Sequence, residues 1–275
     1  MTSMASLLSR VALLFCGALL AGCQASLGQL RELAGEHGRQ VDSLAAKSFV
    51  LTYSAPTTRP GQRLRVYLEG DGHAWATRSQ PSLDPSPRHL LVAGLAFTDP
   101  QPSLYLARPC QYRQTTACHT ALWTDRRYAV EIVDSLDEAL NQLKARYGNR
   151  EFELIGYSGG ATLVLLLAAR RSDVTQIQTL AGNLSPQRWV ELKSLSMLDG
   201  SLEPLEQRER LRLIPQRHLL GNADRIIPVE LLNYYRKALE PADCLERALL
   251  PGVEHASGWA EVWPSWQARP LSCHP

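Results

Sequence analysis

The sequence lacks any concentration of charge of one sign. Its 275 residues include 29 lysines and arginines and 27 aspartates and glutamates, for a formal net charge of +2. Proteins that bind nucleic acid usually carry a basic patch or stripe, so we expect no nucleic-acid partner. The absence of internal repeats and of low-complexity tracts argues against a repeat array or a disordered chain. A 45% hydrophobic content is instead enough for one large domain with a sizeable core.

The sequence also lacks an apolar run long enough to span a bilayer as a helix, which takes about 20 residues. The run at Val11–Leu20 has only ten, follows the single charge of Arg10, and has the layout of a secretory signal peptide. Leu20-Ala21-Gly22-Cys23 resembles a bacterial lipobox, which implies cleavage before Cys23 and its acylation. The alternative is an ordinary signal peptide with a chance cysteine.

The lipobox reading predicts where the protein lies. Gln24 follows the cysteine, and in enteric-type sorting this implies the outer membrane rather than the inner one. We therefore expect a protein of the bacterial cell envelope, attached to the outer membrane through its N-terminal lipid and facing the periplasm.

Cysteine pairs with the spacing of a zinc site, CxxC, are missing, which argues against structural zinc. Cys16 would leave with the signal peptide, and Cys23 would carry the lipid. The remaining cysteines are Cys110, Cys118, Cys244 and Cys273. An even number in an oxidising compartment indicates two disulfides. Of three pairings we favour Cys110–Cys118 and Cys244–Cys273, because each pair brackets a local loop or the C-terminal segment; four free buried thiols are the alternative.

Short β-rich runs alternate with helical patterns along the rest of the chain. Strands are predicted at 48–54, 63–70, 103–109, 151–156, 176–182, 217–221 and 246–252, and helices at 128–148, 162–171, 228–239 and 258–269. This alternation is typical of an α/β fold with a mostly parallel central sheet and helices on both faces. Ligands of such sheets bind at the carboxyl ends of the strands.

The same patterns divide the chain into three parts. Residues 1–22 form the lipoprotein signal peptide, residues 23–46 a tether and N-terminal segment with a short helix near Leu30, and residues 47–275 one α/β domain. A polar, proline-containing stretch from Asn183 to Leu211 interrupts the alternation. We expect it to form a small cap of short helices over the site.

A serine stands between a predicted strand and a predicted buried helix. Gly156-Tyr157-Ser158-Gly159-Gly160 fits the pattern G-x-S-x-G. A chain that leaves a strand and enters a helix within one residue must turn sharply, so residues two before and two after the serine must be small. Ser158 is therefore a candidate nucleophile at a helix N-terminus; a tight turn with an idle serine is the alternative.

A nucleophilic serine needs a base, and the base needs an orienting carboxylate. With this topology the chain order is serine, carboxylate, histidine. Asp224 and His255 each follow a later predicted strand, so both would reach the carboxyl edge near Ser158. The less well placed candidates are His37, His89, His119, His218 and His274 for the base and Asp199, Asp243 and Glu254 for the carboxylate.

The segment VYLEGDGHAW, residues 66–75, is the candidate oxyanion loop. One N–H donor should come from Gly159, and the second from either Asp71 or Gly72. The pocket-lining candidates are His73, Trp75 and Tyr157. Glu69 stands where the HG-type loop of esterases often has histidine. Glu69, Asp71 and His73 could also suggest a metal site, but alternate loop residues rarely suffice for one, so we expect no metal and no cofactor.

The segments LEGDGHAW, ARPCQY and GYSGG together make the chain resemble an α/β-hydrolase, and more narrowly the bacterial α/β-hydrolase lipoproteins. The resemblance extends from about Phe49 to the end, and implies the fold and the Ser158-Asp224-His255 triad. We therefore expect a lipid-anchored serine hydrolase, carboxylesterase- or lipase-like, that cleaves a small-molecule or lipid ester through an acyl-enzyme. The alternatives are a thioesterase, amidase or acyltransferase with the same triad, or a non-catalytic outer-membrane binding protein.

Overall fold

A central twisted sheet organises the molecule. The computed structural model describes residues 26–271, and within that range the sheet has eight strands in the order β1-β2-β4-β3-β5-β6-β7-β8. The strands are β1 (Val41–Ala46), β2 (Phe49–Ser54), β3 (Arg63–Leu68), β4 (Ser103–Leu106), β5 (Glu151–Tyr157), β6 (Val174–Leu180), β7 (Gln216–Gly221) and β8 (Leu245–Leu250). Strands β3 to β8 are parallel, and β1 and β2 are antiparallel. The predicted mostly parallel sheet is confirmed.

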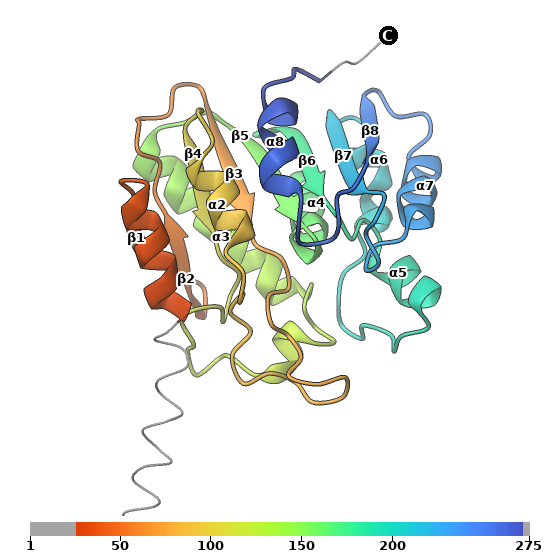
Figure 1. The fold of residues 1–275 in the computed structure, drawn as a ribbon, viewed down its shortest axis with the longest axis horizontal. Helices are drawn as coiled ribbons and strands as arrows, with labels where there is room; N and C mark the ends of the chain where they lie inside the picture. Colours follow the sequence, from red (N-terminus) through yellow and green to blue (C-terminus); the bar gives the residue numbers. More distant parts are fainter. Residues whose placement is uncertain (1–25, 272–275) are drawn as a thin grey trace, which may run out of the picture.

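Helices cover both faces of this sheet (Figure 1). A helix over residues 26–36, α2 (Leu91–Phe97) and α8 (Trp259–Gln267) pack on one face, and α3 (Val130–Tyr147), α4 (Gly159–Arg170) and α7 (Val229–Ala238) pack on the other. Strand alternation separates the two cores: Leu64 and Val66 of β3 face the α3 and α4 layer, and Tyr67 faces α2 and α8. Helix α4, apolar on all sides, is buried between the sheet and its neighbours.

The N-terminal part of the described chain contains the short helix predicted near Leu30, but it is not a tether. Residues 26–36 form a helix, and its Leu30 is fully buried in the core with α2. Strand β1 then pairs with β2 along its whole length. Residues 26–46 are thus part of the folded domain, because apolar side chains every three or four positions bury the helix and β1 completes the sheet edge. The short α2 was also not predicted.

The predicted cap, residues 183–211, contains α5 (Pro186–Lys193), the 3-10 helix η2 (Pro204–Gln207) and α6 (Arg208–Leu211). Helix α5 begins with Pro186 at its first position, and the side chain of Ser185 accepts the N–H of Arg188. Of these three helices, only α5 adds side chains to the cavity described below, because η2 and α6 pack against α4. Asn183, which precedes α5, lines that cavity too. A second 3-10 helix, η1 (Thr120–Trp123), precedes α3.

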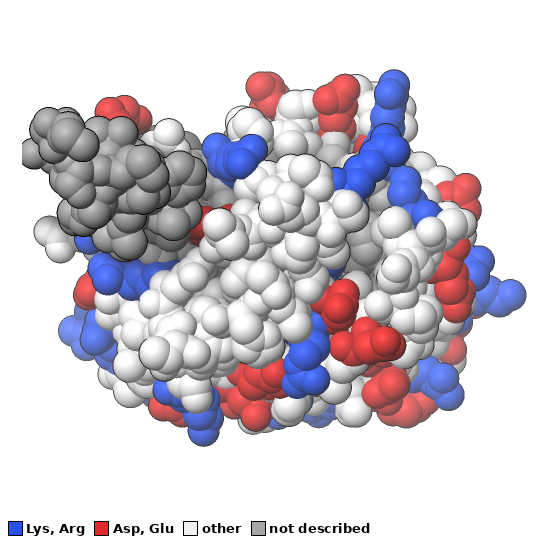
Figure 2. Space-filling view, turned by 90° about the horizontal axis from the view of Figure 1, so that it is seen from below, with Lys and Arg blue, Asp and Glu red and all other residues white. Residues whose placement is uncertain are grey.

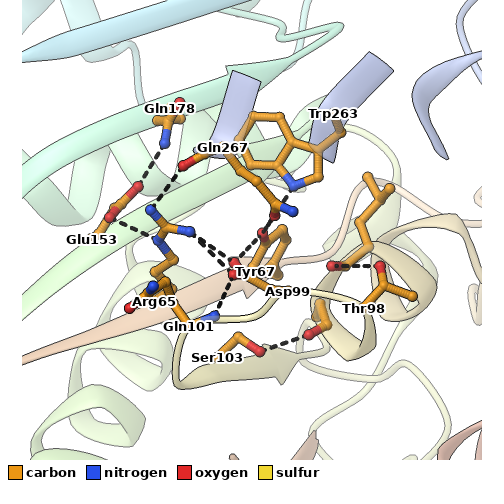
Figure 3. Close-up of polar contacts among 12 residues, drawn as sticks. Arg65, Tyr67, Thr98, Asp99, Gln101, Ser103, Glu153, Gln178, Trp263 and Gln267 are labelled. Atoms are coloured by element: carbon orange, nitrogen blue, oxygen red, sulfur yellow. Dashed lines mark hydrogen bonds and ion pairs between the residues drawn. The ribbon is translucent and has the colours of Figure 1, made fainter. Parts of the chain in front are cut away.

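A buried polar network at the amino ends of the strands fixes α8 to the sheet (Figure 3). The guanidinium of Arg65 on β3 pairs with both Asp99 and Glu153 at 3.0–3.1 Å. Tyr67 donates to Asp99 at 2.6 Å and accepts the indole N–H of Trp263 on α8 at 2.9 Å. Because buried charges are costly unless paired, these contacts hold α8 in one place, which matters for the loop that precedes it.

None of the helices within residues 26–271 is long and apolar enough to cross a membrane. The predicted signal peptide (residues 1–22), Cys23 and Cys273 lie outside the described residues.

Candidate active site

Ser158 is the single residue between β5 and α4, and its backbone is strained. Its φ of 51° and ψ of −121° lie in a region that residues other than glycine rarely occupy. A residue held in such a conformation costs about 1–3 kcal/mol of folding free energy. A Cβ atom at Gly156 would lie 2.6 Å from the carbonyl oxygen of Gly160, and one at Gly160 would lie 2.5 Å from that of Leu68. Both glycines are therefore required for the turn that presents the hydroxyl of Ser158.

A chain of hydrogen bonds joins three of the predicted site residues. Nε2 of His255 lies 3.0 Å from Oγ of Ser158, and Nδ1 of His255 lies 2.9 Å from Oδ2 of Asp224. Asp224 follows β7 and His255 follows β8, so all three reach the same edge of the sheet from separate strands. This geometry lets the imidazole accept the serine proton while the carboxylate holds its other nitrogen.

Both partners of Ser158 are held by their own loops. Oδ1 of Asp224, whose side chain is buried, accepts the backbone N–H groups of Ile226 and Ile227 at 2.7 and 2.9 Å. The carbonyl of His255 accepts the hydroxyl of Tyr157 at 3.0 Å and the indole N–H of Trp259 on α8 at 2.9 Å. The imidazole position therefore depends on α8 and, through it, on the polar network at the opposite edge.

The competing residues considered from the sequence lie elsewhere. His218 is fully buried in β7 between Thr179 and Gln216, and burial lowers its pKa to about 3. Glu254 is exposed and accepts a hydrogen bond from Ser257. Neither His218 nor Glu254 takes part in the hydrogen bonds that join Ser158, His255 and Asp224.

Two backbone N–H groups in the loop after β3 have no hydrogen-bond partner within residues 26–271 and could donate to a ligand. The N–H of Gly70 donates to the side chain of Glu69 at 2.9 Å, and that of His73 donates to Pro85 at 3.1 Å. Between them, the N–H groups of Asp71 and Gly72 have no hydrogen bond to any residue in the range 26–271. Gly72 has φ +64°, and a Cβ there would lie 2.1 Å from the carbonyl oxygen of Pro85, so only glycine fits this turn.

Glu69 is a buried carboxylic acid beneath this loop. Its two oxygens accept the N–H of Gly70 and, at 2.8 Å, the hydroxyl of Tyr105. Burial raises the pKa of Glu69 to about 7, although both of these hydrogen bonds and Arg108 act in the opposite direction. Where the HG-type loop of esterases often has histidine, this chain thus places an acid that supports the loop backbone.

Asp71 is held by two arginines that sequence reasoning did not single out. Its carboxylate pairs with Arg108 and, at 2.8 Å, with Arg127, and the hydroxyl of Tyr128 lies 3.3 Å away. Burial alone would raise the pKa of Asp71, but Arg127 and Arg108 outweigh it and lower the pKa below its usual value. Arg108 belongs to the quoted segment ARPCQY, but only the tertiary structure reveals its partner.

Two cavities flank Ser158. One, of about 410 Å³, is the more polar of the two, and its lining includes Glu69, His73, Arg88, Tyr157 and His255. The other, of about 370 Å³, is more apolar, and its lining includes Trp75, Asn183, Trp189, Ile226 and Ile227. The three predicted pocket residues, His73, Trp75 and Tyr157, all line one or both cavities.

Asn183 is a further residue that the sequence did not indicate. Its side chain is buried, lines the apolar cavity, and its Oδ1 has no hydrogen-bond partner within residues 26–271. Its backbone N–H donates to the carbonyl of Ser158 at 3.0 Å. This amide oxygen is thus a buried acceptor beside the serine, without a partner in that range.

The structure brings no group of three metal-ligating side chains together within residues 26–271. Of the loop residues weighed for that role, Glu69 is bonded to Tyr105, and Asp71 is paired with arginines. The loop that carries Arg108 is closed by a disulfide between Cys110 and Cys118. Cys244 also takes part in a disulfide, and its predicted partner, Cys273, lies outside the described residues.

Solved structures resemble this fold across nearly their full length. An esterase from Pyrococcus furiosus aligns with a TM-score of 0.62 at 11% identity, covering 86% of this chain and 90% of its own. A candidate dienelactone hydrolase from Klebsiella pneumoniae aligns with a TM-score of 0.59 at 16% identity, covering 83% and 95%. An alpha-beta serine hydrolase homologue from Coxiella burnetii aligns with a TM-score of 0.53 at 13% identity, covering 83% and 93%.

No protein-family model matches the sequence, and no curated protein does. At these low identities the structural matches establish the fold and nothing finer. The chain has the α/β-hydrolase fold, as the sequence predicted.

Proposed function

We propose that the protein is a serine hydrolase that cleaves carboxylic esters. The observation that carries this proposal is the hydrogen-bonded chain from Ser158 through His255 to Asp224 at a strained strand-to-helix turn. Strain of this kind persists only where the surrounding structure imposes it, and it is common at active sites. The fold, which the compared esterase shares, adds support by analogy.

The proposed reaction uses the chain's own groups throughout. Oγ of Ser158 attacks the ester carbon while Nε2 of His255 takes its proton, and the oxygen that becomes negative accepts N–H groups from Gly159 and from Asp71 or Gly72. His255 then protonates the leaving alcohol. Water, deprotonated by the same imidazole, releases the acid from the acyl-enzyme. Asp224 fixes the tautomer of His255 and stabilises its charged form.

The test compares the wild type with Ser158→Ala on chromogenic esters of increasing acyl length, with matched thioesters and amides. We expect the variant to lose a factor on the order of 10³ or more in kcat with unchanged thermal unfolding. A fluorophosphonate probe should label the wild type and not the variant, because only an activated serine reacts quickly. A wild type that is neither labelled nor active would instead indicate a binding protein on this fold.

We further propose that Cys23 carries a lipid anchor in the outer membrane. One acyl chain gives marginal membrane binding, whereas two or more give stable attachment, and a bacterial lipobox cysteine receives a diacylglycerol. The wild type should incorporate labelled palmitate and fractionate with membranes, and Cys23→Ala should incorporate none. A wild type without palmitate, free in the periplasm, would refute the anchor.

A further inference from the structure

The described chain begins beside the candidate active site. Ser26 and Gln29, at the start of the first helix, line a groove of about 540 Å³ together with His73 and Arg88. His73 and Arg88 also line the more polar of the two cavities beside Ser158. Figure 1 shows the same arrangement: this helix begins at the end of the molecule where the loops after the strands lie. The point at which the chain enters the domain is therefore at the mouth of the site.

The position of this entry point is fixed. Leu30 and Ala34 are fully buried against α2, and Leu27 and Leu33 pack beside them. Cys23 lies only three positions before Ser26, and three residues span at most about 10 Å. A lipid on Cys23 would hold this end of the domain at the membrane surface, which a tether running to residue 46 would not do.

The surface around the site mouth carries exposed apolar side chains beside a few charged ones, among them Arg78, Arg88 and Asp125. The exposed large hydrophobic side chains that line the cavities and the groove are Leu83 (73%), Leu195 (50%), Ile226 (45%) and Trp75 (37%). Met197 (55%) is also exposed and lies in the sequence between Ser196 and Leu198, which line the outermost cavity. Residues 75–83 contain one arginine and no acid, and residues 194–198 contain no charge. Figure 2 shows this end of the molecule, where a broad surface without charged residues extends beside charged edges. Exposed apolar patches of this kind mark interaction surfaces.

The apolar cavity beside Ser158 continues to this surface. It shares Trp75 and Trp189 with a further cavity of about 580 Å³, which Leu195 and Leu198 also line. Two neighbouring cavities that share Trp75, Trp189 and Arg127 thus lie between the serine hydroxyl and the exposed apolar side chains named above, which we call the rim.

Resting on the proposed hydrolase function and lipid anchor, we propose that this rim lies against the bilayer that holds the anchor. Ser158 then cleaves long-chain acyl esters of that membrane, and the acyl chain passes between Trp75 and Trp189. The substrate class is a lipid ester rather than a soluble one. Arg78 and Arg88, which are exposed in the same loops, suit the anionic headgroups of such a surface.

The first test measures contact without catalysis. The lipid-modified full-length protein, carrying Ser158→Ala, is reconstituted into phosphatidylcholine vesicles with and without brominated acyl chains, which quench nearby tryptophan fluorescence. Trp75→Phe should reduce the quenched component, to which Trp189 still contributes, and Trp266→Phe, on α8, should leave it unchanged. Equal quenching in both variants, or none in the parent, would overturn the proposal.

The second test measures substrate delivery. Leu83→Gln/Met197→Gln should hydrolyse a soluble short-chain ester at the wild-type rate but a bilayer-held long-chain ester about fivefold more slowly. Leu213→Gln is the matched control, since Leu213 is 51% exposed and lies before β7 at the opposite edge. Wild-type rates of the double variant on the bilayer-held ester would refute the membrane-facing rim. Absence of all esterase activity, with Trp75 still quenched, would refute the proposed chemistry instead.

Discussion

The carboxylate of Asp71 occupies the space beside the α-carbon of Gly159. A Cβ atom on Gly159 would lie 2.1 Å from Oδ1 of Asp71. A carboxylate so close to a proposed oxyanion donor would oppose the negative charge that forms in ester hydrolysis. Arg108 and Arg127 pair with Asp71 and neutralise the charge of its carboxylate. The loop after β3 can therefore approach α4 closely without destabilising the oxyanion.

Gly159→Ala tests this close approach. The added methyl group must displace Asp71, and with it the loop that carries the second proposed N–H donor. We expect kcat on a soluble ester to fall by about 10²-fold and the free energy of unfolding to fall by about 1–3 kcal/mol. Gly94→Ala is the control, because no atom lies within 4 Å of its added Cβ in α2. An active, stable Gly159→Ala variant would contradict the assigned geometry.

Asp224→Asn should preserve the loop after β7 but reduce ester hydrolysis. The amide oxygen can still accept the N–H groups of Ile226 and Ile227. The amide nitrogen would then face Nδ1 of His255 and favour the tautomer in which Nε2 carries the proton. We expect a loss of about 10³–10⁴ in kcat with little change in thermal unfolding. Asp199→Asn, at an exposed position, should retain activity; equal losses in both variants would argue against Asp224 as the orienting residue.

Glu69 should make stability depend on pH. Its pKa is raised from 4.5 to about 7 in the folded state, so between these values the folded protein binds more protons than the unfolded chain. Stability from this group is full below pH 4.5 and is lost as the pH rises toward 7, by up to about 3 kcal/mol. Glu69→Gln should flatten this part of the profile, measured by urea unfolding from pH 4.5 to 8.

The control for this profile is Glu36→Gln at an exposed position of the first helix. It should reproduce the wild-type pH dependence. A Glu69→Gln profile that still falls with rising pH would assign the effect to another group.

The Cys110–Cys118 disulfide should stabilise the loop that carries Arg108. It closes a loop with a sequence separation of 8, for which the chain-entropy estimate is about 2–3 kcal/mol. Cys110→Ala/Cys118→Ala should lose about this much free energy of unfolding. Because Arg108 pairs with Asp71, kcat should fall as well. Full activity in the destabilised variant would separate the disulfide from the site.

The pairing of Cys244 with Cys273 is tested by peptide mapping of protein from the periplasm under non-reducing conditions. We expect one linked peptide pair that contains these two cysteines, which would clamp β8 and the loop of His255. A linkage of Cys273 to Cys110 would contradict the predicted pairing.

Sequence reasoning placed the turn at Ser158 correctly because its causes are local. A strand, a glycine on either side and an apolar helix are encoded within some twenty consecutive residues, and the glycines are required by backbone contacts in the turn itself. The alternation of strands and helices likewise predicted the parallel sheet. Parallel strands bring their carboxyl ends to one edge, so the positions of Asp224 and His255 after later strands were enough to place them near the serine.

The tertiary structure alone decided what surrounds these residues. Arg108 and Arg127 reach Asp71 from segments 37 and 56 positions away, and neither has a local pattern that predicts a partner. The short helix near Leu30 was predicted, but residues 26–46 as a whole resembled a tether because β1 is a short edge strand with weak alternation. Residues 26–46 are held in place by packing on α2 and pairing with β2, and these two surfaces form only when the chain folds. Neighbouring residues determine the local backbone turn at Ser158. Charge pairing and packing at the sheet edge instead depend on distant segments that only the folded chain brings together.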